Sequence, residues 1–173
     1  MATKKTSMFT LTERITVSAG GTATFATIDL GSYIDVGDRQ ALQVHSVDFI
    51  FQGTTAADDF TTDLGAGREM MVQITDLNRG GLVFADDRAL VASGSLNVDQ
   101  QEGLQQSADL YPDNFGKGSD DGRFVVNDQL YVTALATALN NPLNCTVRVN
   151  ASIVTLSSKD FMAIAIQSTA ADN

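Results

Sequence analysis

The sequence contains one histidine, His45, and one cysteine, Cys145, so chemistry that depends on these side chains has few places to occur. His45 lies within an apolar run and no Gly-x-Ser-x-Gly motif accompanies it, which favours a structural histidine over a hydrolytic triad. A single histidine and a single cysteine also cannot supply the usual ligands of a zinc site. Because the sequence has a single cysteine, it cannot form an intrachain disulfide, and we expect Cys145 to be a small buried hydrophobic residue. We therefore expect no catalytic residue, no metal ligand and no cofactor, and a protein that is not an enzyme.

Carboxylates are far more abundant and form two clusters along the chain. The clusters are Asp58, Asp59 and Asp63, and Asp109, Asp113, Asp120 and Asp121. Calcium prefers six to eight oxygen ligands, but neither cluster has the spacing of an Asp-x-Asp/Asn-x-Asp/Asn-Gly loop. Solvated acidic loops are therefore the favoured interpretation, with divalent-ion binding left open.

Two further motifs are weaker. The glycine-rich segment 116–122 lacks the spacing of a phosphate loop, and its two aspartates would repel phosphate, so we expect a flexible loop. The sequons Asn144-Cys145-Thr146 and Asn150-Ala151-Ser152 fall in or beside an expected strand. Because a glycan needs an accessible asparagine, we interpret both sequons as chance matches.

Alternation of apolar and polar residues predicts a succession of strands. The expected strands are 9–17, 22–30, 41–52, 69–77, 82–85 with 88–92, 123–134 and 145–156. The apolar phase changes between Phe25 and Ile28 and again near His45-Ser46, so we expect a β-bulge at each place. Residues 33–38 and 54–67 are expected to form loops, the second one exposed, and 99–122 forms the longest irregular stretch.

One short helix is expected near the end of the chain, where Ser157 can cap it with Asp160 as a weakened capping box. Phe161, Ile164 and Ala165 would then share one face. About eight strands with almost no helix predict an all-β fold, a single eight-stranded antiparallel jelly roll with this C-terminal helix. An immunoglobulin-like sandwich is the runner-up, although its core tryptophan and cysteine pair are absent. We expect a flexible arm over 1–8, one jelly-roll domain over 9–167 and a flexible tail over 168–173.

The charge balance narrows the classes of partner. The 173 residues include 21 acidic residues, eighteen of them aspartate, and eleven basic residues, which gives a net charge of −10. Such a chain is poorly suited to nucleic acid, because phosphate binding depends on Lys and Arg. High Asp with low Lys suits strong brine, where salt screens carboxylate repulsion, although an ordinary acidic surface is the alternative. We find no signal-peptide pattern and no apolar run long enough to cross a membrane.

Three stretches carry a resemblance to a known family: TERITVSAGGTATFATIDLG, ALQVHSVDFIFQG and VRVNASIVTLSSKDFMAIAIQS. With the short arm bearing Lys4 and Lys5, the chain resembles the small single-jelly-roll major capsid proteins of tailless icosahedral viruses with an internal membrane, particularly those of halophilic archaea. The resemblance is one of architecture, size and composition, without a diagnostic motif.

The resemblance implies a structural virion protein, made in the host cytoplasm and located in the capsid. It would self-assemble, or co-assemble with a second jelly-roll protein, into an icosahedral shell. The implied partners are other copies of the chain, that second capsid protein and an underlying viral membrane, with no direct contact with nucleic acid.

Two other classes stay open on the residues alone. A carbohydrate-binding sandwich, similar to a lectin, would present aromatic side chains from loops, for which Tyr33, Phe60, Tyr111 and Phe115 are the candidates. A surface-layer or filament subunit would donate a terminal strand to its neighbour, and the strand that begins at Phe9 is a possible donor.

Overall fold

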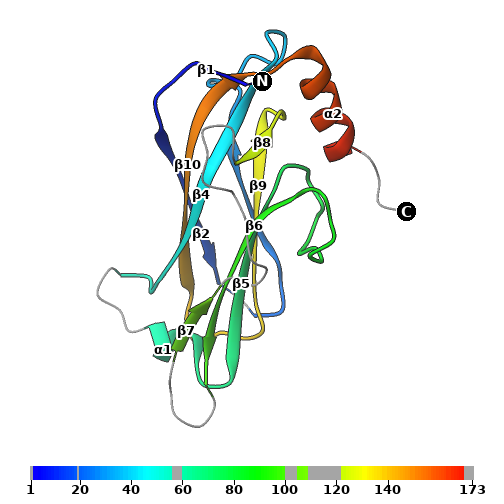
Figure 1. Cartoon of the computed structure of the whole chain (residues 1–173). Helices are drawn as coiled ribbons and strands as arrows, with labels where there is room; N and C mark the ends of the chain where they lie inside the picture. The colour runs from blue at the N-terminus through cyan, green and yellow to red at the C-terminus, as the bar shows by residue number, and fades with distance from the viewer. Residues whose placement is uncertain (1, 19, 56–59, 100–104, 109–121, 170–173) are drawn as a thin grey trace.

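The computed structural model describes residues 2–18, 20–55, 60–99, 105–108 and 122–169, and it shows two antiparallel sheets packed face to face (Figure 1). Its elements, in chain order, are β1 (Thr3–Lys4), β2 (Phe9–Val17), β3 (Thr24–Asp29), β4 (Gln40–Gln52), α1 (Phe60–Leu64), β5 (Arg68–Thr75), β6 (Leu90–Val98), β7 (Gln105–Ala108), β8 (Arg123–Val125), β9 (Gln129–Ala136), β10 (Leu143–Thr155) and α2 (Ser158–Thr169). Neither helix is long and apolar enough to cross a membrane within these described residues.

The strand order is that of a jelly roll. The first sheet runs β2-β10-β4-β8, and the short β1 pairs with the end of β10 on the same side as β2. The second sheet runs β3-β9-β5-β6-β7. Without β1 and β7, eight strands interleave between the two sheets as two Greek keys. The all-β jelly roll with a short C-terminal helix, expected from the sequence, is thus confirmed.

The main core lies between the sheets and is built from alternate residues of the long strands. β10 pairs with β2 on one side and with β4 on the other, so it is the central strand of the first sheet. Its core-facing side chains are Leu143, Cys145, Val147, Val149, Ala151 and Ile153, and those of the facing sheet include Met70, Val72, Ile74, Leu130 and Val132. This strict alternation is why the sequence pattern identified β10 and β2 so well.

At the free edge of the first sheet, β2 carries a charge on its inner side. Glu13 occupies the core-facing phase between Leu11 and Ile15 and is half-buried. A charged side chain that points inward from an edge strand disfavours the addition of a further strand, because the new strand would bury it. β2 is therefore a protected edge.

One of the two expected bulges is present. The register between β4 and β10 shifts at Asn150/Ala151, which pair with Ser46 and Val44 and leave His45 as the extra residue. The bulge expected between Phe25 and Ile28 is absent, because β3 keeps an unbroken register with β9. Phe25 instead points outward and is 54% exposed. The apolar pattern of β3 changes phase because this aromatic side chain lies on the outer face of the sheet.

Two expected strands differ in the structure. Residues 82–85 form no strand, and the piece expected over 88–92 begins at Leu90 and continues to Val98. The strand expected over 123–134 divides into β8 and β9, which lie in different sheets. The chain turns at Asp128, whose carbonyl accepts a hydrogen bond from the amide of Leu30. Continuous apolar residues on both sides of this turn hide it from a periodicity argument.

The two stretches expected to be irregular also contain elements. The loop expected to be exposed over 54–67 includes α1, where Leu64 and Asp63 are buried, so that prediction was wrong for this part of the loop. β7, within the expected irregular stretch 99–122, pairs with the end of β6. The remainder of that stretch, apart from residue 99 and residue 122, lies outside the described residues.

The C-terminal helix covers a second, smaller apolar cluster on the outer side of the first sheet. The Ser157 hydroxyl accepts a hydrogen bond from the Asp160 amide at 3.2 Å and donates to its carboxylate at 2.8 Å, which confirms the expected capping box. The helix packs with the residues predicted for its inner face, Phe161, Ile164 and Ala165, against Ala41, Val126, Val154 and Leu156.

The expected N-terminal arm, residues 1–8, contributes to the same region. β1 pairs Thr3 with Thr155 and Lys4 with Val154, and Ala2 packs against the smaller cluster. The expected tail, 168–173, begins within α2, which ends at Thr169, and residues 170–173 lie outside the described residues.

Close packing of the two sheets makes Gly94 a sensitive position. A β-carbon at Gly94 in β6 would lie 2.6 Å from the ring of Phe49 in the opposite sheet. We expect Gly94→Ala to lower the free energy of unfolding by about 1–3 kcal/mol, because the ring must shift within a packed core. Urea denaturation measures this change. Gly81→Ala is the matched control, since nothing lies within 4 Å of a β-carbon there, and an equal effect of both substitutions would contradict the packing argument.

Candidate functional site

His45 is partly buried and has a hydroxyl neighbour. Its Nε2 lies 2.9 Å from the Oγ of Ser152, which is completely buried and donates to Gln43 Oε1 at 3.4 Å. Burial, followed by the positive charge of Lys4, lowers the pKa of His45. The imidazole and the hydroxyl thus tie β4 to β10, and this arrangement fits a structural histidine.

Cys145 lies on the core-facing side of β10 and is fully buried. Burial raises the pKa of its thiol to about 12, so the sulfur is protonated and shielded at neutral pH. The prediction of a small buried hydrophobe is confirmed.

The two sequon asparagines use their amides to join β10 to its neighbours. Asn144 accepts a hydrogen bond from Thr16 at 2.6 Å and donates to the Gly53 carbonyl at 2.8 Å, and Asn150 accepts from Thr10 at 2.7 Å and donates to Ser46 at 2.9 Å. A glycan on either nitrogen would have to share that nitrogen with a bond that holds β10 to its neighbours. Both side chains therefore have a structural role that the sequon pattern does not reveal.

Of the acidic candidates, only Asp63 lies in the described part of the chain. Its Oδ1 accepts a hydrogen bond from Asn141 Nδ2 at 2.9 Å, which ties α1 to the turn before β10. The others, Asp58, Asp59, Asp109, Asp113, Asp120 and Asp121, lie outside the described residues, as does the glycine-rich segment before residue 122. Among the side chains that the structure describes, no three of His, Cys, Asp or Glu are grouped to hold a metal ion.

The loop aromatics expected for a carbohydrate site are only partly described. Tyr33 stacks on Phe9, with ring centroids 5.6 Å apart and an interplanar angle of 15°, so one face of its ring is already covered. Tyr111 and Phe115 lie outside the described residues, and of Phe60 only the backbone is described.

A different feature stands out on the second sheet: the loop 76–89, which joins β5 to β6 and which we call the braced loop. It folds back toward the outer face of that sheet. The buried side chain of Gln73 in β5 accepts a hydrogen bond from the Val83 amide at 2.8 Å and donates to the Val83 carbonyl at 2.9 Å. One glutamine side chain therefore satisfies both backbone groups of Val83, which has no strand partner.

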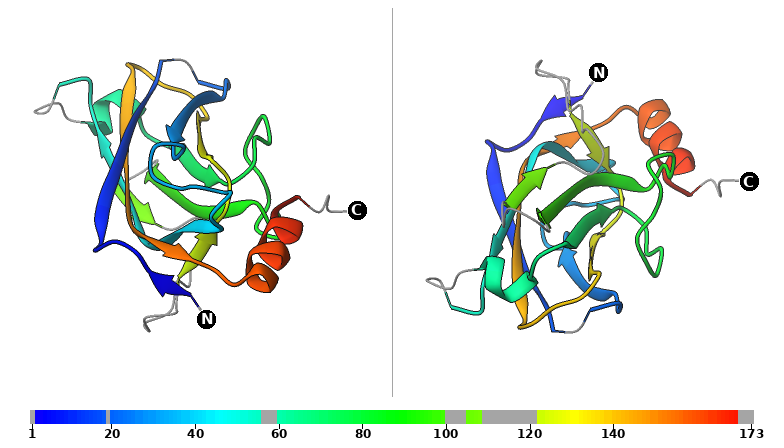
Figure 2. Two further views of the ribbon diagram at one scale, coloured as in Figure 1. Left: turned by 90° about the horizontal axis from the view of Figure 1, so that it is seen from above. Right: turned by 90° about the horizontal axis from the view of Figure 1, so that it is seen from below.

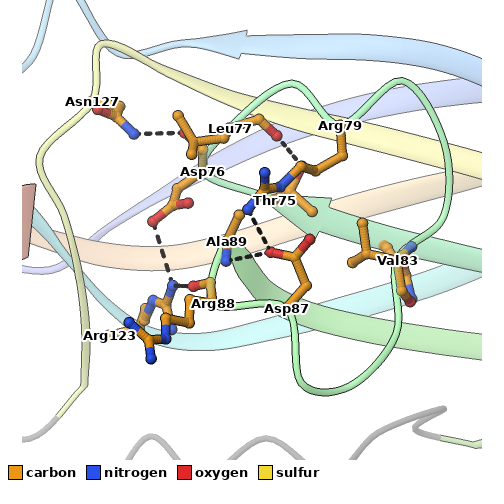
Figure 3. Close-up of polar contacts among 11 residues, drawn as sticks. Thr75, Asp76, Leu77, Arg79, Val83, Asp87, Arg88, Ala89, Arg123 and Asn127 are labelled. Carbon is orange, nitrogen blue, oxygen red and sulfur yellow. Dashed lines mark hydrogen bonds and ion pairs between the residues drawn. The ribbon is translucent and has the colours of Figure 1, made fainter. Parts of the chain in front are cut away.

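Both ends of the braced loop meet at a buried carboxylate (Figure 3). Asp76 is only 2% exposed, its amide donates to the Ala89 carbonyl at 2.9 Å, and its own carbonyl accepts from Asn127 Nδ2 at 2.6 Å. Its Oδ2 lies 3.4 Å from the guanidinium of Arg123 in β8, which also donates to the Arg88 carbonyl. Desolvation raises the pKa of the Asp76 carboxyl, and the nearby Arg123 opposes this shift.

A second ion pair closes the loop across its width. Arg79 lies 2.9 Å from Asp87, and the same carboxylate oxygen accepts a hydrogen bond from the Ala89 amide at 2.8 Å. At the first turn, the Gly80 amide donates to the Asn78 side chain, and Gly80 has a φ of 69°, which favours glycine. These contacts hold the loop in one shape at several points along its length.

The braced loop carries a highly exposed aromatic side chain, Phe84. Phe84 is 82% exposed, although it lies next to Val83, whose amide and carbonyl are both held by Gln73. Single exposed apolar residues are common on protein surfaces. A phenylalanine on a loop fixed by side-chain hydrogen bonds and ion pairs is a better candidate for a contact residue, because little conformational entropy is lost when it binds.

An apolar pocket of about 480 Å³ opens beside the same loop. It is lined by Phe25, Ala26 and Thr27 of β3, Tyr131 and Val132 of β9, and Asn78 and Gly80 of the braced loop. Its aromatic lining is the exposed ring of Phe25 and the half-buried ring of Tyr131, and the Tyr131 hydroxyl donates to Gln129 at 3.0 Å. The pocket is therefore aromatic with a few polar groups at its margin.

The outer side of α2 adds a further exposed apolar surface. Met162 and Ile166, one helical turn apart, are 60% and 61% exposed. The braced loop and α2 project from the same side of the sandwich (Figures 1 and 2). Exposed apolar side chains thus gather on this side at two separate elements.

The sequence held a signal for this surface that periodicity overlooked. Phe84 lies in a segment that alternates poorly, between the glycines Gly80-Gly81 and the charged pair Asp86-Asp87, which is typical of a loop. The bracing by Gln73 was not predictable, because a buried glutamine in a strand has the same sequence pattern as an exposed one.

The fold and surface define the chain as a single-jelly-roll β-sandwich with externally presented apolar side chains. No known family model matches the sequence, and no curated protein matches it at a significant level.

We expect Gln73→Leu to loosen the braced loop while the sandwich stays folded. The substitution leaves the Val83 amide and carbonyl without their partners, and two lost hydrogen bonds of about 1 kcal/mol each should speed amide exchange in 76–89 by at least about tenfold. Hydrogen–deuterium exchange with mass spectrometry measures this. Gln52→Leu, at an exposed position of β4, is the control, and unchanged exchange in both variants would show that Gln73 does not hold the loop.

The buried carboxylate predicts a pH-dependent difference between the wild type and Asp76→Asn. Because desolvation raises the pKa of Asp76 above 3.8, ionising it costs folding free energy. That cost is absent below the unfolded-state pKa and develops as pH rises from it through the folded-state pKa. The stability of Asp76→Asn relative to wild type should therefore increase between about pH 3 and about pH 6.

Chemical denaturation at the two pH values measures this difference. Asp86→Asn, an exposed position on the same loop, controls for the loss of one surface charge. A relative stability of Asp76→Asn that falls as pH rises would mean that the Arg123 pair outweighs desolvation.

Proposed function

We propose that this chain is a structural subunit of an icosahedral viral shell, which self-assembles or co-assembles with a second jelly-roll protein. The proposal extends to a location in the virion and to a role without catalysis. The observation that carries it is Phe84, 82% exposed on a loop that buried side chains hold in place. Rigid, exposed aromatic residues are typical anchors of protein–protein contacts.

The protected edge at β2 supports the same proposal. The inward-pointing Glu13 disfavours strand addition at β2, so contacts through exposed apolar side chains are favoured over open-ended sheet growth. Met162 and Ile166 on α2 offer a second such contact on the same side of the molecule. A closed shell needs at least two distinct contacts per subunit, and the surface provides candidates for both.

Charge sets the conditions for assembly in this proposal. Each subunit has a net charge of −10, so copies repel one another unless salt screens the carboxylates. We expect the purified protein to be monomeric or dimeric at low salt and to form large regular particles in multi-molar NaCl, alone or with its partner. Light scattering coupled to size-exclusion chromatography measures the change, followed by electron microscopy.

Charge variants make this test specific. Replacing the exposed carboxylates of Asp38 and Asp128 by Asn should lower the salt concentration needed for assembly, and Arg14→Gln, which adds net negative charge, should raise it. An assembly threshold that does not follow charge would contradict the screening argument. If the protein stays monomeric at every salt concentration, both alone and when it is co-expressed with a second jelly-roll protein, the shell proposal is contradicted.

A carbohydrate-binding module is the second candidate, and the pocket beside β3 is the observation that favours it. Phe25 and Tyr131 offer aromatic surfaces, and Asn78 and Thr27 offer polar groups, which is the composition of many small-ligand sites. Binding on a glycan array that is lost in Tyr131→Ala would support this candidate.

A further inference from the structure

We propose that the aromatic pocket is the receptor for Phe84 of a second copy of this chain. The inference deepens the proposed shell function, on which its biological meaning rests, by naming one contact between subunits. The knob is Phe84 at the surface of the braced loop, and the hole is the pocket lined by Phe25, Thr27 and Tyr131.

Size and chemistry match between the knob and the hole. The pocket has a volume of about 480 Å³, which admits a phenyl ring with part of the adjoining loop. The rings of Phe25 and Tyr131 can pack against an incoming aromatic ring in stacked or edge-to-face geometry. Phe84 is 82% exposed, so in its own chain the ring occupies no pocket and remains free for a neighbour.

The charge of the braced loop favours a second copy as the occupant. The chain as a whole carries −10, and two copies repel over most of their surfaces. The braced loop together with Arg123, which pairs with Asp76, has no net charge. Its three arginines are Arg79, Arg88 and Arg123, and its three aspartates are Asp76, Asp86 and Asp87. Two copies that meet through this region therefore approach where like-charge repulsion is smallest.

The position of the knob beside the hole allows both to be used at once. Asn78 and Gly80 line the pocket and belong to the same loop as Phe84. In a two-fold arrangement, the Phe84 of each copy enters the pocket of the other, so each subunit gives and receives one ring. The bracing by Gln73 and by the Arg79–Asp87 pair holds both parts of the contact in a fixed relation.

Disulfide trapping between two different variants tests the contact directly. Chains with Phe84→Cys are mixed with chains with Thr27→Cys in multi-molar NaCl under mild oxidation, and covalent dimers are quantified by non-reducing gel electrophoresis. The native Cys145 does not interfere, because it is fully buried. We expect the mixture to yield at least about tenfold more dimer than Phe84→Cys mixed with Thr12→Cys, an exposed position on β2 in the other sheet.

Phe84→Ser provides an independent measurement without engineered cysteines. Sedimentation equilibrium should show self-association weakened by at least about tenfold, while thermal unfolding of the exposed-site variant stays unchanged. Val36→Ser, which removes another exposed apolar side chain away from the braced loop, is the matched control. Equal dimer yields in the two cysteine mixtures, or an equal effect of both serine variants, would overturn the inference.

The outcomes separate this contact from the shell function. Large particles that form normally with Phe84→Ser, and without the specific cross-link, would overturn the contact while leaving the shell proposal standing. A specific cross-link in a protein that never grows beyond a dimer would support the contact and contradict the shell. Glycan binding that depends on Tyr131 and is unaffected by Phe84→Ser would assign the pocket to a sugar and overturn the inference.

Discussion

The arrangement of the outer surface depends on one buried junction between the sheets. Asp76 uses its amide, its carbonyl and its carboxylate toward three separate segments, at Ala89, Asn127 and Arg123. Because a single residue bonds to the far end of the braced loop, to the turn before β9 and to β8, the loop cannot slide along the sheet without breaking several bonds together. Buried polar junctions of this kind specify one geometry, although they add little net stability. The position of Phe84 and the wall of the pocket both follow from it.

The fold was largely predictable from the sequence, whereas the candidate surface was not. Strict alternation in 9–17 and 145–156 identified β2 and β10 because each has one buried face, and the phase change at His45 correctly predicted a bulge. The phase change at Phe25 looked the same in sequence but had a different cause, an aromatic side chain that points to the outside. Periodicity reports burial on one face and carries no information on what a loop brings together. For that reason neither the Gln73 brace nor the pocket could be derived from it.

Outside the main core, side-chain hydrogen bonds connect β10 and α1 to neighbouring elements. Asn144 and Asn150 tie β10 to its neighbours, His45 and Ser152 link β10 to β4, and Asp63 fixes α1 to the turn before β10. Each of these side chains suggests a reaction or a modification when it is considered in sequence alone. In the fold each of them makes at least one hydrogen bond within the chain, whereas Phe84 exposes an apolar surface that is available for recognition.

The central place of β10 has a consequence for the order of folding. This strand spans Leu143–Thr155, yet it lies between β2 and β4 and also pairs with β1. During synthesis the first sheet therefore cannot be completed until residue 155 has left the ribosome, and its contacts join residues far apart in the sequence, which slows folding. A nascent or truncated chain that lacks β10 leaves β2 without its strand partner and β4 with only the short β8 beside it. The first sheet can thus form only after β10 has been made, although β2 and β4 are synthesised much earlier.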